Sequence, residues 1–149
     1  MRRKKISRRK PRAPRRALLI DLENLAYAGV ERLDAPTVGD RLRGVLVAAG
    51  DVSYILVVAP RHAIERHGAQ LASLGLRWEM CAAGQDSADQ QVVQRANDPL
   101  GFGFVEIIVS SGDHYFSRLA PLTKLCVVVP DGVPIAAELR RVSHQIVAA

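Results

Sequence analysis

Short apolar runs that alternate with helical patterns constrain this chain of 149 residues more than any other feature of its sequence. Five runs have the length and composition of buried β-strands: residues 17–22, 52–59, 76–82, 105–110 and 125–129. Helical patterns follow at residues 36–49, 61–74, 87–96, 114–119 and 134–146. Near-continuous Val, Ile and Leu strands separated by helices are typical of a parallel sheet covered on both faces. The sequence therefore predicts an α/β fold: a three-layer α/β/α sandwich with a central parallel sheet.

The chain has the length of one domain, and its composition is that of a globular protein. Apolar residues make up 48% of it and charged residues 24%, so one sizeable core can form. Cys81 and Cys126 lie in apolar runs without CxxC spacing, which favours reduced core thiols in the cytoplasm and disfavours a zinc site. No apolar run approaches the ~20 residues of a membrane span, so we expect no membrane association. The apolar stretch after Arg16 is interrupted by Asp21 and is too short for a secretory signal.

The net charge of +6 is unevenly distributed along the chain. Residues 1–16 contain ten basic and no acidic side chains, whereas residues 17–149 contain 11 basic against 15 acidic, a net charge of −4. With two prolines and few apolar residues, 1–16 is expected to be a disordered tail before a domain at 17–149. Its charge predicts an arm that binds the phosphates of nucleic acid; a solubilising or folded-back extension is the alternative. The side chains assigned to phosphate binding are Arg2, Arg3, Lys4, Lys5, Arg8, Arg9 and Lys10.

Three carboxylates lie where parallel α/β sheets bind their ligands, beyond the carboxyl ends of the strands. Asp21 sits inside the first apolar run, where a carboxylate is costly to bury without a partner. Asp89 precedes Val92 and Val93 by three and four residues, so it projects from the helix face that packs on the sheet. Asp113 follows a strand in the turn SSGD. Carboxylate oxygens at one edge of a sheet predict a hard divalent cation, Mg²⁺ or Mn²⁺.

Each acidic residue at these strand and helix ends also has a structural alternative. Asp21 is alternatively a helix cap or a turn residue, and Asp113 is alternatively a helix cap. Asp89 is alternatively the N3 residue of a capping pair with Asp86, favoured by the helix dipole. Asp86 occupies the expected N-cap position of the helix at 87–96, and capping alone accounts for it. Asp131 lies in the sequence PDG, an ordinary turn after the last predicted strand. Asp86 and Asp131 are therefore compensating ligands at most.

Three motifs in this order resemble the NYN family of PIN-like nucleases: IDLENL at 20–25, QDSADQQVV at 85–93 and IIVSSGDHYFSRL at 107–119. The family pattern has Asp-x-x-Asn after the first strand, Asp at the start of the helix before the fourth strand, and Ser-Gly-Asp-Ser-Asp-Phe after that strand. The resemblance covers about residues 17–145. It implies the sheet order 3-2-1-4-5 and one metal site lined by Asp21, Asn24, Asp89 and Asp113. Asp21 and Asp113 would then end adjacent central strands.

By this resemblance the chain is expected to be a metal-dependent endoribonuclease that acts on RNA. Its catalytic residues and metal ligands would be Asp21, Asp89 and Asp113, holding Mg²⁺ or Mn²⁺. Substrate contacts are expected from Asn24, Ser111 and His114, in addition to the basic arm. For His114, a solvent-facing or hydrogen-bonded turn residue is the alternative.

The sequence departs from the family pattern at Tyr115, which stands where the family has its second Asp. A neutral phenol is a poor Mg²⁺ ligand, which puts two-metal chemistry in doubt unless Asp86, Asp131 or Glu23 compensates. The alternative function is a catalytically weak or inactive NYN-type module that binds RNA, for example on the ribosome.

Two other α/β classes and three minor residues complete the expectations. A receiver-type regulator is disfavoured because it needs a downstream lysine pattern, and residues 17–149 contain only Lys124. A dehalogenase-type phosphatase is disfavoured because it needs Asp-x-Asp, and residues 21–23 read Asp-Leu-Glu. We further expect His62 and His67 on a helix surface. Trp78 is expected in the core, with base stacking as the alternative.

Overall fold

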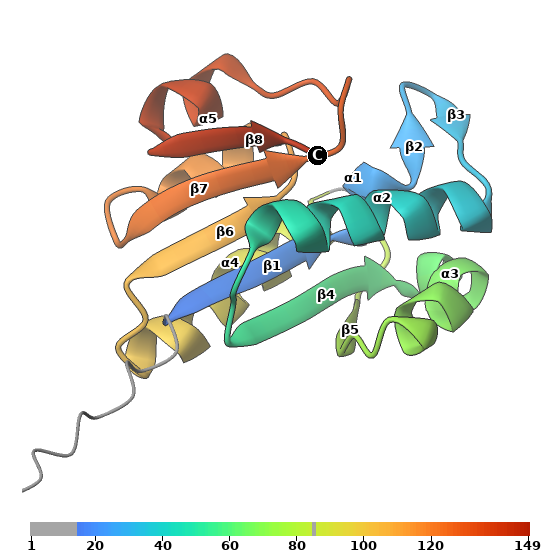
Figure 1. The fold of residues 1–149 in the computed structure, drawn as a ribbon, viewed down its shortest axis with the longest axis horizontal. Coiled ribbons are helices and arrows are strands. Elements are labelled where there is room, and N and C mark those ends of the chain that lie inside the picture. The colour runs from blue at the N-terminus through green and yellow to red at the C-terminus, as the bar shows by residue number, and fades with distance from the viewer. Residues whose placement is uncertain (1–14, 85) are drawn as a thin grey trace, which may run out of the picture.

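The computed structural model describes residues 15–84 and 86–149 (Figure 1). Six parallel strands form one sheet in the order β5-β4-β1-β6-β7-β8. They are β1 (Arg16–Asp21), β4 (Tyr54–Pro60), β5 (Trp78–Cys81), β6 (Glu106–Ser110), β7 (Lys124–Val129) and β8 (Gln145–Ala148). A two-stranded hairpin, β2 (Tyr27–Ala28) and β3 (Glu31–Arg32), stands beyond the carboxyl ends of the central strands (Figure 1).

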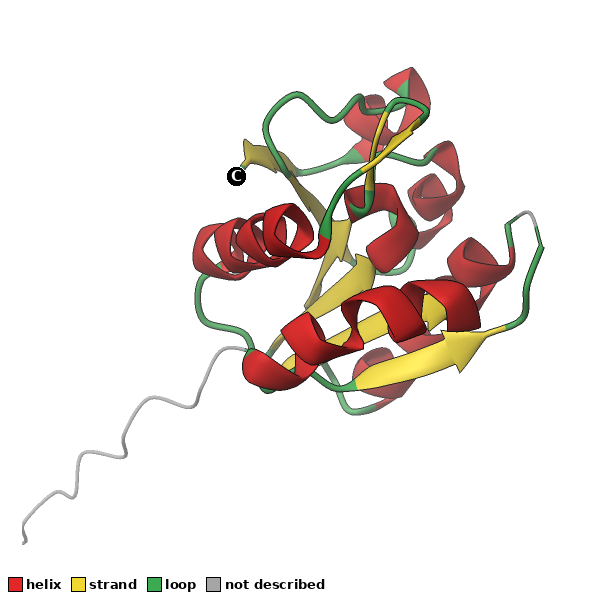
Figure 2. Ribbon diagram, turned by 90° about the vertical axis from the view of Figure 1, so that its right-hand side faces the viewer, coloured by secondary structure: helices red, strands yellow, loops and turns green. Residues whose placement is uncertain are grey.

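Helices cover both faces of the sheet (Figure 2). They are α1 (Leu22–Leu25), α2 (Ala35–Ala49), α3 (Arg61–Ser73), α4 (Ser87–Gly101), the 3₁₀ helix η1 (His114–Leu119) and α5 (Ala137–Val142). Strand side chains alternate between two core clusters. Leu18 and Ile20 pack with α1, α2 and α3, whereas Ala17 and Leu19 pack with α4, η1 and α5. The predicted three-layer α/β/α sandwich is confirmed.

The predicted strand order holds for five strands, and the structure adds a sixth. Counting only the parallel strands along the chain, the order is 3-2-1-4-5-6. The segment 134–146 was expected to be mostly helical, but α5 ends at Val142 and β8 pairs with β7, Gln145 opposite Cys126. An edge strand has one neighbour and a partly exposed surface, so β8 does not need the long apolar run that indicates a buried strand.

Three further expectations are corrected by the structure. The helix expected at 87–96 continues to Gly101, with Pro99 inside its last turn. Trp78 lies on the edge strand β5 and is 45% exposed instead of buried. His67 is 1% exposed and lies on α3 beside the segment after β1, with Ala26 and Tyr27, whereas His62 is on the surface as expected. Cys81 and Cys126 are buried free thiols, as predicted.

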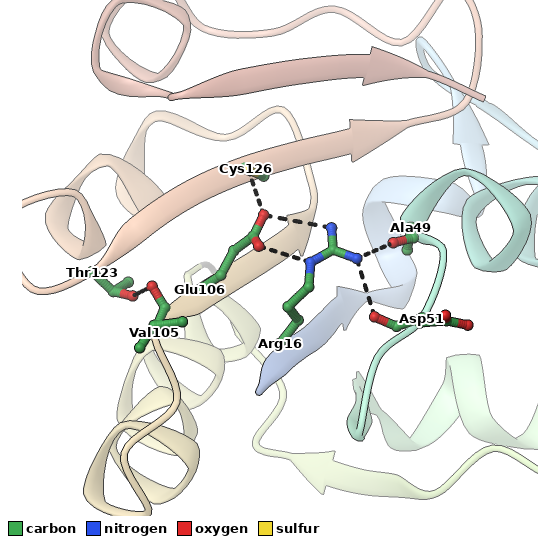
Figure 3. Close-up of polar contacts among 7 residues, drawn as sticks. All are labelled: Arg16, Ala49, Asp51, Val105, Glu106, Thr123 and Cys126. Atoms are coloured by element: carbon green, nitrogen blue, oxygen red, sulfur yellow. Dashed lines mark hydrogen bonds and ion pairs between the residues drawn. The ribbon is translucent and has the colours of Figure 1, made fainter. Parts of the chain in front are cut away.

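The predicted tail boundary at residue 16 is wrong, because Arg16 begins β1 and is tied into the domain (Figure 3). Its Nε donates to Glu106 Oε2 at 2.7 Å, and a terminal nitrogen donates to the carbonyl oxygens of Ala49 and Asp51. Burial alone raises the pKa of Glu106, but the hydrogen bonds from Arg16 and Cys126 outweigh it and lower that pKa. Burial and Glu106 raise the pKa of the Cys126 thiol to about 11, so the thiol stays protonated.

Arg15 is also held by the domain, through a hydrogen bond from its guanidinium to the carbonyl oxygen of Phe102 at 2.9 Å. The remainder of the predicted tail, residues 1–14, lies outside the described residues. This stretch includes all the side chains assigned to phosphate binding: Arg2, Arg3, Lys4, Lys5, Arg8, Arg9 and Lys10.

Replacing Arg16 by Met is expected to destabilise the protein. The change leaves the Glu106 carboxylate without its cation, and the Glu106 side chain is only 9% exposed. Removing one partner of a fully buried ion pair lowers the free energy of unfolding by about 3–5 kcal/mol. Because the Arg16 side chain is 27% exposed, we expect a smaller loss here, about 2 kcal/mol. That loss lowers Tm by on the order of 5 °C. Calorimetry checks the prediction, with Arg12→Met as the control; equal melting of both variants contradicts it.

Candidate acidic active site

The three predicted carboxylates lie at the carboxyl edge of the sheet, on three different elements. Asp21 is the last residue of β1, which pairs with β6 so that Ile20 stands opposite Ser110. Asp113 follows three residues after Ser110, so the adjacent central strands β1 and β6 lead to both carboxylates, as the resemblance implies. Asp89 lies in the first turn of α4, which covers the sheet face that Leu19 shares with Asp21.

Asp21 and Asp89 are both buried, with 6% exposure each. Burial raises the pKa of Asp21 well above its ordinary value, and the Asp89 carboxyl in hydrogen-bonding contact raises it further. Burial also raises the pKa of Asp89; the contact with Asp21 lowers it, and the charges of Asp113 and Asp86 raise it. The structure therefore brings Asp21, Asp89 and Asp113 together as one acidic cluster.

The acidic cluster lacks positive compensation within residues 15–84 and 86–149. Every Lys or Arg ion pair in that part of the chain involves a carboxylate outside the cluster. One oxygen of Asp21, Oδ1, is buried without a hydrogen-bond partner among the described residues. Two neighbouring buried carboxylates are unfavourable unless a cation or a proton neutralises their charge.

Asp113 is held in place by the turn that carries it. Its Oδ1 accepts from the backbone N–H of Tyr115 at 2.8 Å, so the predicted cap of η1 forms. Its own N–H donates to the hydroxyl of the buried Ser111, and the Gly112 N–H donates to Asn24 Oδ1, both at 3.2 Å. The side chains of Ser111 and Asn24, expected as substrate contacts, thus position the turn. About a third of the Asp113 side chain (34%) remains exposed.

Gly112 permits a backbone approach that no other residue would allow. A Cβ at this position would overlap the carbonyl oxygen of Pro134, which belongs to the loop after β7. The Ala136 N–H donates to the Gly112 carbonyl oxygen at 2.8 Å, so a hydrogen bond also joins the turn at 111–113 to the segment after β7. The sequence indicated a tight turn at residues 111–112, but not this crossing of two loops.

The remaining predicted residues, Asp86, His114 and Asp131, lie outside the acidic cluster. Asp86 occupies the N-cap position of α4 in a left-handed conformation (φ 64°), without a capping hydrogen bond from its side chain. His114 is exposed, with Nδ1 3.3 Å from Asp113 Oδ1. Asp131 is exposed in the turn after β7 and lines a cavity together with Glu23 and Asn24. Glu23 pairs with His62, a contact that the sequence did not indicate.

Tyr115, at the position of the departure from the family pattern, makes two contacts. Its backbone N–H donates to Asp113 Oδ1 in the cap of η1. Its ring lies under the guanidinium of Arg118, whose central carbon is 4.0 Å from the ring centroid. The ring also meets Phe116 edge-on. The phenol is therefore part of a cation–π pair on η1.

The oxygen donors of the acidic cluster do not form a closed metal cage in the described part of the chain. Among the described residues, no group of three or more His, Cys, Asp or Glu side chains is arranged to hold a metal ion. Mg²⁺ commonly keeps several waters and uses only one or two protein carboxylates together with substrate phosphates. The unpartnered Asp21 Oδ1 and the neighbouring Asp89 are oxygen donors of that kind.

Comparison with solved structures finds the same fold in a protein of unknown function from Vibrio parahaemolyticus RIMD 2210633. The two share 18% identity over 91% of this chain and 93% of that chain, with a TM-score of 0.62. At this identity the likeness shows the fold alone. No family model matches the chain, and no curated protein matches it significantly. Within the described residues, no helix has both the length and the apolar character needed to cross a membrane.

Proposed function

We propose that this protein is a metal-dependent endoribonuclease of the NYN type, acting on RNA in the cytoplasm. The observation that carries the proposal is the acidic cluster. Asp21, Asp89 and Asp113 come from separate elements and meet at the ligand-binding edge of a parallel sheet. Two of them are buried without a compensating Lys or Arg in the described part of the chain, which is unfavourable unless a proton or another cation neutralises them.

In this proposal Asp21 and Asp89 hold a Mg²⁺ or Mn²⁺ ion, and Asp113 adds an oxygen from the exposed side. When bound, such an ion neutralises phosphodiester charge and activates a water. Ser111 and Asn24 fix the turn so that Asp113 keeps its orientation while substrate binds. The exposed His114 lies beside Asp113, where it can donate a hydrogen bond to a phosphate oxygen.

Cleavage of a labelled, unstructured RNA tests the proposal. The wild-type protein is expected to cleave it with Mn²⁺ or Mg²⁺ and not with EDTA. Asp89→Asn should reduce the rate by about 100-fold or more, because it removes one of the charges that hold the ion. Asp98→Asn, an exposed change on the same helix, is the matched control and should cleave normally. Equal cleavage by Asp89→Asn would contradict the assignment of the site.

A second candidate function, RNA binding without turnover, is favoured by one observation. Tyr115 replaces the second Asp of the family motif, and its ring is engaged by Arg118 instead of offering a ligand. Wild-type protein that binds the labelled RNA but cleaves it with neither ion would support this function over the nuclease.

The proposed arm is expected to dominate affinity for RNA through its charge. Residues 1–14 carry eight basic side chains, and each phosphate contact releases counterions. Changing all eight to Gln should weaken binding by about 100-fold at low salt and flatten the salt dependence by up to about 6 in log–log slope. Fluorescence anisotropy across a salt series measures both. Arg16 is left unchanged in this variant because it belongs to β1. An unchanged slope would contradict the assignment of residues 1–14 as a phosphate-binding arm.

A further inference from the structure

A cavity of about 550 Å³ adjoins the acidic cluster and takes no part in the proposed metal chemistry. Its walls come from the segment after β1, from α2 and from the turn after β7, and include Asn24, Tyr27, Arg41, Asp131 and Pro134. Asn24 links the cavity to the acidic cluster, since it lines the cavity and its Oδ1 accepts a hydrogen bond from the Gly112 N–H, next to Asp113. The volume lies within the range of small-ligand sites, roughly 300–1,000 Å³, and suits one nucleotide.

The lining of this cavity combines a ring, a hydrogen-bond donor and an acceptor. The half-buried Tyr27 supplies an aromatic ring. Arg41 is anchored by one terminal nitrogen, which donates to the carbonyl oxygens of Leu25 and Tyr27 at 3.1 and 3.0 Å. A guanidinium has five N–H donors, so three remain for a ligand. The carboxylate of Asp131 has no hydrogen-bond partner among residues 15–84 and 86–149, whereas Glu23 is already paired with His62.

We infer that the cavity binds a guanine base of the RNA substrate. Guanine presents two acceptors, O6 and N7, which match the forked donors of an Arg. On its Watson–Crick edge it presents two adjacent donors, N1–H and the 2-amino group, which match a carboxylate such as Asp131. Adenine, cytosine and uracil do not offer this combination of an acceptor pair for Arg41 and a donor pair for Asp131. Tyr27 adds a stacking surface for the ring.

This inference rests on the proposed function, because it takes RNA as the substrate of the acidic cluster. A guanosine bound in the cavity would place a neighbouring phosphodiester toward Asp113, because Asn24 lines the cavity and contacts the turn that carries Asp113. Cleavage would then be selective for positions next to a guanosine. The arm binds phosphates without regard to sequence, so base selection falls to the cavity.

Binding of mononucleotides tests the inference without any cleavage. Calorimetric titrations of full-length protein with 5′-GMP, AMP, CMP and UMP, in EDTA, are expected to show GMP binding about tenfold more tightly than the others. Asp131→Asn should remove this preference by weakening GMP alone. Tyr27→Leu should weaken all four nucleotides by about tenfold. Asp98→Asn should change nothing. Equal affinity for the four nucleotides, or a GMP preference that survives Asp131→Asn, would overturn the inference.

The failure of this inference can be told apart from the failure of the proposed function. A GMP preference in a protein that cleaves no RNA would uphold the base site and reject the nuclease. Metal-dependent cleavage together with equal nucleotide affinities would uphold the nuclease and reject the base site.

Discussion

Replacing Asp21 by Asn is expected to reduce RNA cleavage by about 100-fold or more while making the protein more stable. Asn keeps the shape of Asp but removes a buried charge that has no cation in the described part of the chain. Relief of such a charge is worth about 1–2 kcal/mol, which raises Tm by roughly 3–6 °C for a chain of this length. A residue whose removal stabilises the fold and abolishes activity is retained for function. Calorimetry in EDTA, where no bound ion stabilises wild type, checks the stability half, and the RNA cleavage assay with Mn²⁺ checks the activity half.

The stability difference between Asp21→Asn and wild type should depend on pH in one direction. Burial and Asp89 raise the pKa of Asp21 in the folded protein above its unfolded value of about 3.9. Below about pH 4 the carboxyl is protonated in both states, so its stability contribution is fully present and the two proteins should melt nearly together. As pH rises from there through the raised pKa, wild type loses that contribution and the variant does not. A difference that instead shrinks between pH 4 and pH 7 would contradict an uncompensated Asp21.

Gly112→Ala is expected to disturb both the fold and the acidic cluster. The added Cβ would overlap the Pro134 carbonyl oxygen, so the turn at 111–113 or the loop after β7 must move. Overpacking of this kind costs about 2–3 kcal/mol, equivalent to a fall in Tm of roughly 6–9 °C. Asp113 is attached to the same turn, so RNA cleavage should fall at temperatures where the variant is still folded.

Gly101→Ala is the matched control for Gly112→Ala. Nothing lies within 4 Å of a Cβ at Gly101, which is the last residue of α4. This variant should melt at or slightly above the wild-type temperature, because Ala is the better helix former, and it should cleave like wild type. If Gly112→Ala also melts like wild type, the close approach of the two loops is not a constraint on the fold.

Much of the fold could be predicted from the sequence because its strands are buried on both faces. Runs such as 52–59 and 125–129 are apolar at nearly every position, which indicates a central parallel strand directly. The edge strands β5 and β8 face water on one side, and there the pattern was weak or absent. Arg16 was assigned to the tail because composition alone cannot reveal an ion pair with Glu106, ninety residues away.

Two carboxylates of the acidic cluster could be predicted because each of them breaks a local apolar pattern. Asp21 interrupts a strand and Asp89 interrupts the inner face of a helix, so both were visible as misplaced charges. The cavity could not be predicted in this way. Tyr27, Arg41 and Asp131 are unremarkable in their own segments, and only the packing of α2 and the turn after β7 beside β1 brings them together.

Crystals of the protein soaked in Mn²⁺ test the central claim, that the acidic cluster holds a divalent ion, most directly. Anomalous scattering locates the ion without any assumption about activity. The account predicts an anomalous peak in contact with carboxylate oxygens of Asp21 and Asp89, beside Asp113, that disappears in Asp21→Asn. Ordered Mn²⁺ elsewhere on the protein, with no peak at this cluster under saturating conditions, would contradict it.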